Sequence, residues 1–219
     1  KAVEYDARAD RIAYTTSVIS EIIEKDIRQN RKINHVSVFD RVMEYAISNF
    51  GAPVSIKNLL AYFNTKEGVP IKRETLNRYL GILVDAKILY PCKRFDLKSK
   101  RALAGEQKYY LADLSFYYAV NTDNRINYGP ALENITYAYA RALGYSASVG
   151  KIGKLECDFI LRSPENDYAY VQVSRTIADP STEEREYRAL EAIRDAYPKY
   201  LLTMDSILQK RNGIRHVNI

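Results

Sequence analysis

Four polar residues in the C-terminal part of the chain have types and spacing suited to metal-dependent chemistry. They are Glu133, Asp158, Gln172 and Ser174. Carboxylate and amide oxygens can bind Mg²⁺, and a metal held in this way can activate water for hydrolysis. A serine hydroxyl carries no charge and cannot stabilise a metal hydroxide as an ammonium group can. Glu133 and Asp158 are therefore candidate metal ligands.

Two short apolar segments joined by a polar turn must position three of these residues. The first segment, the turn and the second segment are residues 155–161, 162–167 and 170–174. This pattern is typical of a β-hairpin. Because strand side chains alternate between faces, Glu156 and Asp158 share one face of the first strand, and Gln172 and Ser174 share one face of the second. The hairpin can thus form one polar cluster.

Glu133 lies on a different element, an apolar segment with helical spacing that ends before Gly144. A helical acid can complete a metal site built on two strands. Lys154, four residues before Asp158, is on the same strand face if the strand extends that far, and it could supply the missing positive charge. Arg175 is expected to point away from the cluster.

Length and composition are those of an ordinary globular chain. The 219 residues are 47% hydrophobic and 27% charged, enough for one large domain or two small ones. The chain has no signal-peptide core and no apolar run of about 18 residues, so we expect no membrane partner and a cytoplasmic location. It begins at Lys1 without an initiator methionine, and we expect a fragment of a longer protein.

Charge and metal-binding residue types narrow the range of partners. The net charge of +6 is compatible with a polyanionic partner. The two cysteines and two histidines form no CxxC or Cys/His cluster, which argues against a zinc site and a disulfide framework.

The segment 36–113 has the element order of a winged helix-turn-helix domain. The expected elements are helices at 38–47, 56–62 and 72–86 and strands at 88–92 and 108–111. In a DNA-binding version the third helix enters the major groove and the loop between the strands contacts phosphates. The candidate contacts are Lys72, Arg73, Asn77 and Arg78 on the helix and Lys93, Arg94, Lys98, Lys100 and Arg101 in the loop. Winged helices also serve as protein-interaction modules, and that alternative stays open.

Helix and strand signals alternate after the hairpin. Ser181 and Glu184 have the spacing of a capping box, and the helix that they begin is expected to end at Pro198. Strands are expected at 200–204 and 215–219. At the other end of the chain, residues 11–28 read as an amphipathic connector helix.

These segments, in this order, resemble a known family. The chain resembles the C-terminal half of prokaryotic P-loop ATPases of the AAA type, in which a winged helix and a degenerate restriction-nuclease-like (PD-(D/E)XK) domain of unassigned function follow the ATPase core. The stretches that carry the resemblance are 24–27, 108–114, 129–134, 156–159, 170–174 and 197–205.

The resemblance implies a mixed α and α/β fold in four parts. The parts are a connector helix at 1–35, a winged helix-turn-helix domain at 36–113, a linker at 114–127 and a restriction-nuclease-like α/β domain at 128–219.

It also implies roles for the polar cluster. Asp158 and Gln172 would hold Mg²⁺, Glu133 would complete the site, and a lysine two residues after Gln172 would help to activate water. That position is Ser174, as in a branch of the family with Gln-Val followed by a small residue. The sequence has no P-loop, because Gly153-Lys154 is followed by leucine, so ATP is expected only on a preceding domain.

Three functions follow from these patterns. The first is a non-catalytic regulatory region of an AAA-type ATPase that binds double-stranded DNA or a protein partner as well as its own ATPase domain. The second is a Mg²⁺-dependent nuclease with a relocated lysine such as Lys154. The third is a protein-protein interaction or dimerisation module.

Overall fold

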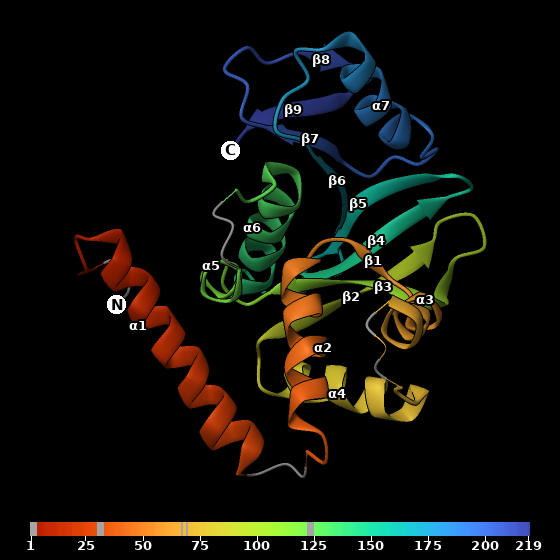
Figure 1. Ribbon diagram of the computed structural model, residues 1–219. Coiled ribbons are helices and arrows are strands. Elements are labelled where there is room, and N and C mark those ends of the chain that lie inside the picture. Colours follow the sequence, from red (N-terminus) through yellow and green to blue (C-terminus); the bar gives the residue numbers. More distant parts are fainter. Residues whose placement is uncertain (1–3, 30–32, 67, 69, 122–124) are drawn as a thin grey trace. The chain divides into compact units, whose positions relative to one another are not determined.

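The chain folds into two compact units, each with its own core. The computed structural model describes residues 4–29, 33–66, 68, 70–121 and 125–219 (Figure 1). The first unit comprises Lys1–Pro91 and Tyr109–Ile126, and the second comprises Cys92–Lys108 and Asn127–Ile219. The expected winged-helix segment 36–113 therefore contributes its residues 92–108 to the second unit.

The first unit is mainly helical. Its elements are α1 (Arg8–Glu21), the π-helix η2 (Ile22–Arg28), α2 (Val36–Ser48), β1 (Pro53–Val54), α3 (Ile56–Ala61), the π-helix η3 (Tyr62–Lys66), α4 (Arg73–Asp85) and α5 (Ser115–Val120). Apolar side chains spaced three and four residues apart on α2 and α4 are buried, and Phe39 meets Tyr79 edge-on with ring centroids 5.4 Å apart. The packed helices hold α4 with its polar face outward.

The helices lie where the sequence predicts them, but two connections differ. Strands β2 (Leu89–Asp96) and β3 (Arg101–Leu111) are longer than expected, so the turn between them is only residues 97–100. The expectation of a long basic loop is wrong, because Lys93, Arg94 and Arg101 lie within strands. The expected linker at 114–127 contains the helix α5, whose Phe116 is buried.

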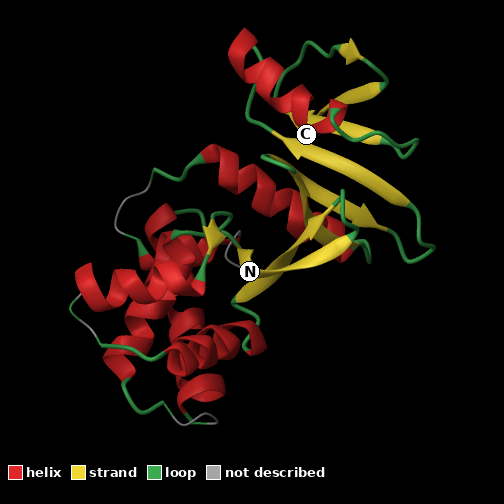
Figure 2. Cartoon of the chain, turned by 90° about the vertical axis from the view of Figure 1, so that its right-hand side faces the viewer, coloured by secondary structure: helices red, strands yellow, loops and turns green. Residues whose placement is uncertain are grey.

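The second unit is a mixed α/β structure around a twisted sheet (Figure 2). It contains α6 (Tyr128–Ala142), β4 (Ser146–Ile152), β5 (Leu155–Arg162), β6 (Tyr168–Val173), α7 (Pro180–Glu191), β7 (Lys199–Thr203), β8 (Lys210–Arg211) and β9 (Ile214–Asn218). The strand order here is β3-β2-β4-β5-β6-β7-β9-β8. Strands β4, β5 and β6 are antiparallel neighbours, whereas β6, β7 and β9 are parallel. The expected hairpin is confirmed, with Phe159 opposite Val171.

Helices α6 and α7 cover opposite faces of this sheet. Phe159 packs against Tyr137 of α6, with ring centroids 6.1 Å apart, whereas Ile160 belongs to the buried cluster that contains Tyr187 and Leu190 of α7. Adjacent strand residues point to opposite faces. The α7 face of β5 therefore also receives Asp158, which brings the predicted acid towards α7.

Both ends of α7 differ from the expectation. The N-cap is Asp179, whose carboxylate accepts a hydrogen bond from the Thr182 amide at 2.9 Å. Pro180 occupies the first helical turn, where its missing N–H costs nothing. Ser181 is inside the helix and donates its hydroxyl to Asp179. The helix ends at Glu191, well before Pro198.

Candidate functional site

A pocket of about 510 Å³ in the second unit brings the predicted polar residues together. Glu133, Lys154, Asp158, Gln172 and Ser174 all line it. Glu156 and Arg175 line it as well, together with three charged residues that the sequence does not single out, Arg185, Glu186 and Arg188. The polar side chains predicted from the hairpin and the upstream helix thus line one surface-accessible cavity.

The helix α6 places Glu133 at this pocket. The side chain of Asn127 caps the helix by accepting a hydrogen bond from the Gly129 amide at 3.1 Å. Ala131, Leu132 and Tyr137 are buried and anchor the helix on the sheet. Glu133, which follows Leu132, therefore projects towards the strand ends.

Lys108 is the centre of the site and is not predicted by the sequence. Its side chain comes from β3 and is 5% exposed. The ammonium nitrogen lies 2.9 Å from Glu133 Oε2, 3.3 Å from Glu156 Oε1 and 3.8 Å from Asp158 Oδ1. Burial by itself would lower the pKa of Lys108, but these three carboxylates raise it above the ordinary value. The lysine therefore keeps its charge in the fold.

A second cation, Arg94 of β2, neutralises Glu156 from the other side. Its guanidinium forms ion pairs with Glu156 and with Glu106 of β3. Burial tends to raise the pKa of Glu156, but Lys108 and Arg94 bring it below the ordinary value. Arg94 is only 9% exposed, so the guanidinium that the sequence suggested for DNA contact is committed to carboxylates inside the fold.

Asp158 and Gln172 are held by the sheet itself. Asp158 Oδ2 accepts a hydrogen bond from the Val173 amide at 2.9 Å, and Gln172 Oε1 accepts one from the Asp158 amide at 3.2 Å. The amide nitrogen of Gln172 donates to Glu186 Oε2 at 2.7 Å, and Arg185 also pairs with Glu186. Burial and the charge of Glu133 raise the pKa of Asp158 well above the usual range. The Asp158 carboxyl group therefore binds a proton more readily than an ordinary aspartic acid does.

The residues around the missing lysine position lie at the edge of the network. Ser174 donates its hydroxyl to the Thr176 carbonyl at 3.1 Å. Lys154 is exposed in the turn before β5, and the nearest ammonium to the carboxylates is that of Lys108. The expectation that Arg175 points away is wrong, because Arg175 lines the pocket and its guanidinium lies 4.8 Å from the Tyr128 ring centroid.

Three carboxylates of the cluster converge on one ammonium group, that of Lys108. Across the residues that the structure describes, no group of three or more His, Cys, Asp or Glu side chains is arranged to hold a metal ion. The predicted ligands Glu133 and Asp158 both direct an oxygen towards Lys108. In this arrangement the carboxylates and Lys108 form an ion-pair network.

The candidate DNA contacts divide between the two units. Lys72, Arg73, Asn77 and Arg78 are all exposed at the start and on the outer face of α4 in the first unit. The remaining candidates apart from Arg94 are exposed in the second unit, and they are Lys93, Lys98, Lys100 and Arg101.

Comparison with known proteins places the chain in a family. An uncharacterized protein of Haemophilus influenzae is 30% identical over 191 residues, which are 86% of this chain and 46% of that protein. The chain thus spans about half the length of this relative. No solved structure matches, and in the described residues no helix has the length and apolar character needed to cross a bilayer. Residues 1–126, more than half of the 219, match the domain of unknown function DUF8612, and the chain belongs to this family.

Proposed function

We propose that the chain is a non-catalytic, DNA-binding regulatory region of a longer AAA-type ATPase. In this proposal a winged helix precedes a restriction-nuclease-like domain that no longer performs metal-dependent hydrolysis. The observation that carries the proposal is the Lys108 ammonium, which lies between Glu133, Glu156 and Asp158.

The Lys108 contacts explain how an acid cluster persists without a metal. Buried carboxylates that face one another repel, and each needs a cation or a hydrogen-bond donor. Lys108 and Arg94 supply two cations, and the Val173 amide supplies a donor to Asp158. A buried ion pair held in this way keeps its geometry without a bound ion.

The order of elements supports the fold assignment. The second unit runs α6-β4-β5-β6-α7-β7, with β4-β5-β6-β7 adjacent in the sheet. This succession of a helix, an antiparallel three-stranded meander, a second helix and a parallel strand agrees with a restriction-nuclease-like core. The helices α2, α3 and α4 of the first unit precede the strands β2 and β3 in the chain, an order that agrees with a winged helix.

Exposed basic side chains on α4 support DNA as the partner. Lys72, Arg73 and Arg78 are exposed and accompanied by Asn77, which is the kind of surface that contacts phosphates and base edges. Glu74 on the same helix is also exposed and would have to face away from the phosphates. The proposal needs only α4, because the other basic candidates lie in the second unit.

A cleavage and metal-binding assay tests the loss of catalysis. Supercoiled plasmid is incubated with the chain and Mg²⁺ or Mn²⁺, and heat released on titration with either metal is measured. We expect intact plasmid and no saturable heat at millimolar metal. Nicking that requires metal and disappears in both Asp158→Ala and Lys108→Met would overturn the proposal.

That outcome would support a second candidate, a Mg²⁺-dependent nuclease. One observation favours it: Lys108 brings to the pocket the ammonium group that Ser174 lacks. The relocated lysine would then be Lys108, which touches the acids, and Lys154→Met would leave nicking unchanged.

Fluorescence anisotropy with labelled duplex DNA tests the partner. We expect affinity that falls with rising salt, because bound Lys and Arg release counterions from DNA. Replacing Lys72, Arg73 and Arg78 by alanine should weaken binding about uniformly across sequences and reduce the salt slope by about one per lost phosphate contact. The matched control is Lys98→Ala, Lys100→Ala and Arg101→Ala, which removes equal charge from the second unit. If only the control variant loses affinity, α4 is not the contact surface.

A further inference from the structure

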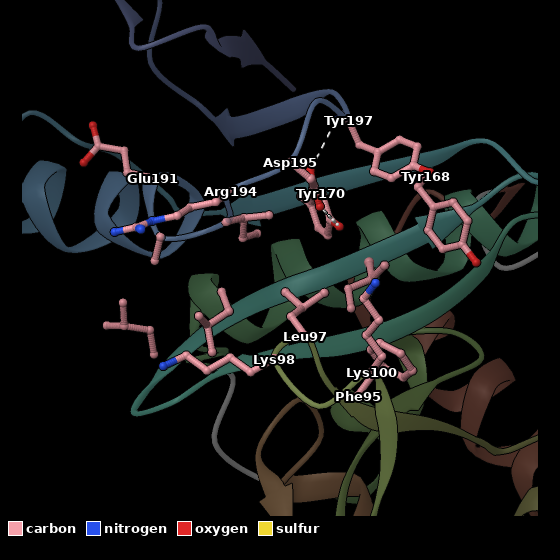
Figure 3. Close-up of a pocket in the computed structure, with 15 residues that line it drawn as sticks. Phe95, Leu97, Lys98, Lys100, Tyr168, Tyr170, Glu191, Arg194, Asp195 and Tyr197 are labelled. Carbon is pink, nitrogen blue, oxygen red and sulfur yellow. Dashed lines mark hydrogen bonds between the residues drawn. The ribbon is translucent and has the colours of Figure 1, made fainter.

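A larger cavity of about 1020 Å³ lies in the second unit, beyond the Lys108 network (Figure 3). The β2–β3 turn forms one side, and the segment between α7 and β7 forms the other. Lys98 and Lys100 rise from the first side, and Arg194 extends from the facing side (Figure 3). We call this cavity the sheet groove.

The floor of the sheet groove is apolar. Leu97, Ile152, Leu155 and Ile160 line it, and all four pack on or within the buried cluster beneath α7. Such a floor favours side chains that leave water on binding, at about 25 cal/mol per Å² of apolar surface. A purely polar ligand would not bury this apolar floor, so it would gain nothing from it.

Aromatic side chains close one end of the groove. Tyr168 and Tyr197 lie with ring centroids 5.3 Å apart, and Tyr197 is 48% exposed. Tyr170 donates its hydroxyl to Asp195 at 2.6 Å, which fixes the segment before β7 against the sheet. The groove is therefore preformed on one side by a hydrogen-bonded loop.

The carboxylates at the groove have ion-pair or hydrogen-bond partners within the fold, whereas its basic side chains lack ion pairs in the part of the chain that the structure describes. Glu191 pairs with Arg211, and Asp195 accepts hydrogen bonds from Tyr170 and from the Tyr197 amide. Among the described residues, no carboxylate lies within ion-pair distance of Lys98, Lys100 or Arg194, which are all exposed. The groove thus presents three positive charges around an apolar floor, and Asp96 partly offsets that of Lys98.

We infer that the sheet groove binds an acidic, amphipathic helical segment of a protein partner. Apolar side chains of the segment pack on Leu97, Ile152 and Ile160, and its flanking carboxylates pair with the cations on the two sides. This is the helix-in-groove mode of recognition, in which apolar anchors recur at helical spacing. Nucleic acid fits less well, because bases could stack on the aromatic side chains at one end of the groove but would gain little from its aliphatic floor.

The test is anisotropy of a labelled helical peptide about 18 residues long with leucine and phenylalanine at i, i+3, i+4 and i+7 and glutamate elsewhere. We expect saturable binding by the whole chain that weakens with salt. The variant Lys98→Glu, Lys100→Glu and Arg194→Glu should lose about tenfold or more in affinity. Tyr197→Ala, at an exposed position, should also weaken binding while leaving the fold intact.

Matched controls separate the groove from general charge. The variant Lys72→Glu, Arg73→Glu and Arg78→Glu makes the same change in net charge on the first unit and should keep peptide affinity. A peptide of equal composition whose sequence destroys the apolar face should bind about tenfold more weakly. Absence of peptide binding, or equal loss in both charge-reversal variants, overturns the inference. Tighter binding of a single-stranded oligonucleotide, lost in the groove variant, would assign the groove to nucleic acid instead.

Discussion

At the scale of single residues, Lys108 determines what the acid cluster can do. Three carboxylates lie within 3.8 Å or less of its ammonium nitrogen, and its side chain is almost completely buried. A positive charge at this point offsets the repulsion among the three carboxylates. The chemistry of the cluster therefore depends on one residue that comes from a distant strand.

Replacing Lys108 by methionine tests this dependence. The change keeps side-chain volume but leaves Glu133 and Asp158 without the Lys108 cation, so we expect a loss of about 3–5 kcal/mol in the free energy of unfolding, measured by urea denaturation. Lys154→Met, at an exposed turn, should change it by less than about 0.5 kcal/mol. Millimolar Mg²⁺ or Ca²⁺ should restore part of the loss in Lys108→Met and have no effect on the native chain. Equal stability of the two variants would contradict the central role of Lys108.

Asp158 gives the cluster a defined pH dependence. Burial and Glu133 raise its pKa above the value near 3.9 expected in the unfolded chain. The folded state then binds the proton more tightly, so the contribution of Asp158 to stability is complete below about pH 4 and is lost as the pH rises through the folded pKa. Asp158→Asn does not titrate and should gain stability relative to the native chain between about pH 4 and pH 7. A difference that stays constant with pH would mean that Lys108 holds Asp158 ionised throughout.

At the scale of elements, the cap of α7 is a direct test of helix placement. Asp179→Ala removes the acceptor for the Thr182 amide and should cost about 1 kcal/mol, within a range of about 0.5–2 kcal/mol. Ser181→Ala is the matched control, because Ser181 lies inside the helix and should cost less. Thermal or urea unfolding of both variants measures the difference. A larger loss of stability in Ser181→Ala than in Asp179→Ala would indicate that Ser181 is the N-cap residue.

The elements that the sequence predicts are those with strong periodic patterns. The hairpin of β5 and β6 alternates apolar and polar side chains, and α2, α4 and α6 have apolar residues at helical spacing. Strand β4 escapes prediction because its residues are small and include Gly150. A side chain there would bring Cβ to 3.2 Å from Cys157 Cβ, a close approach that favours glycine and that only the folded sheet reveals.

The candidate site is predictable only where its members are close in sequence. Asp158 and Gln172 follow from the hairpin, and Glu133 follows from a helix with a clear boundary. Lys108 and Arg94 reach the site through the pairing of β2 with β4, which aligns Arg94 with Val149. A lysine in a strand ordinarily indicates an exposed face, and nothing local marks Lys108 as buried. Tertiary pairing alone makes it part of the network.

At the scale of the whole molecule, the β2–β3 hairpin belongs to both units. Residues 92–108 lie in the second unit although the chain before and after them lies in the first. A domain cut at residue 128, as the sequence suggests, lacks Lys108, Arg94 and the strand that pairs with β4. The second unit is therefore a discontinuous folding unit.

This arrangement predicts different behaviour for two fragments of the chain. The fragment 92–219 retains every residue of the second unit and should unfold in one cooperative thermal transition. The fragment 128–219 should unfold at lower temperature and less cooperatively, because β4 loses its neighbour β2 and the carboxylates lose both cations. Glu133→Gln, Glu156→Gln and Asp158→Asn together, placed in 128–219, separate the two causes. If that variant recovers the lost stability, the loss comes from repulsion among the carboxylates. If it does not, the loss comes from the missing strands. Equal melting temperatures of the two unaltered fragments would show that residues 92–127 are dispensable for this fold.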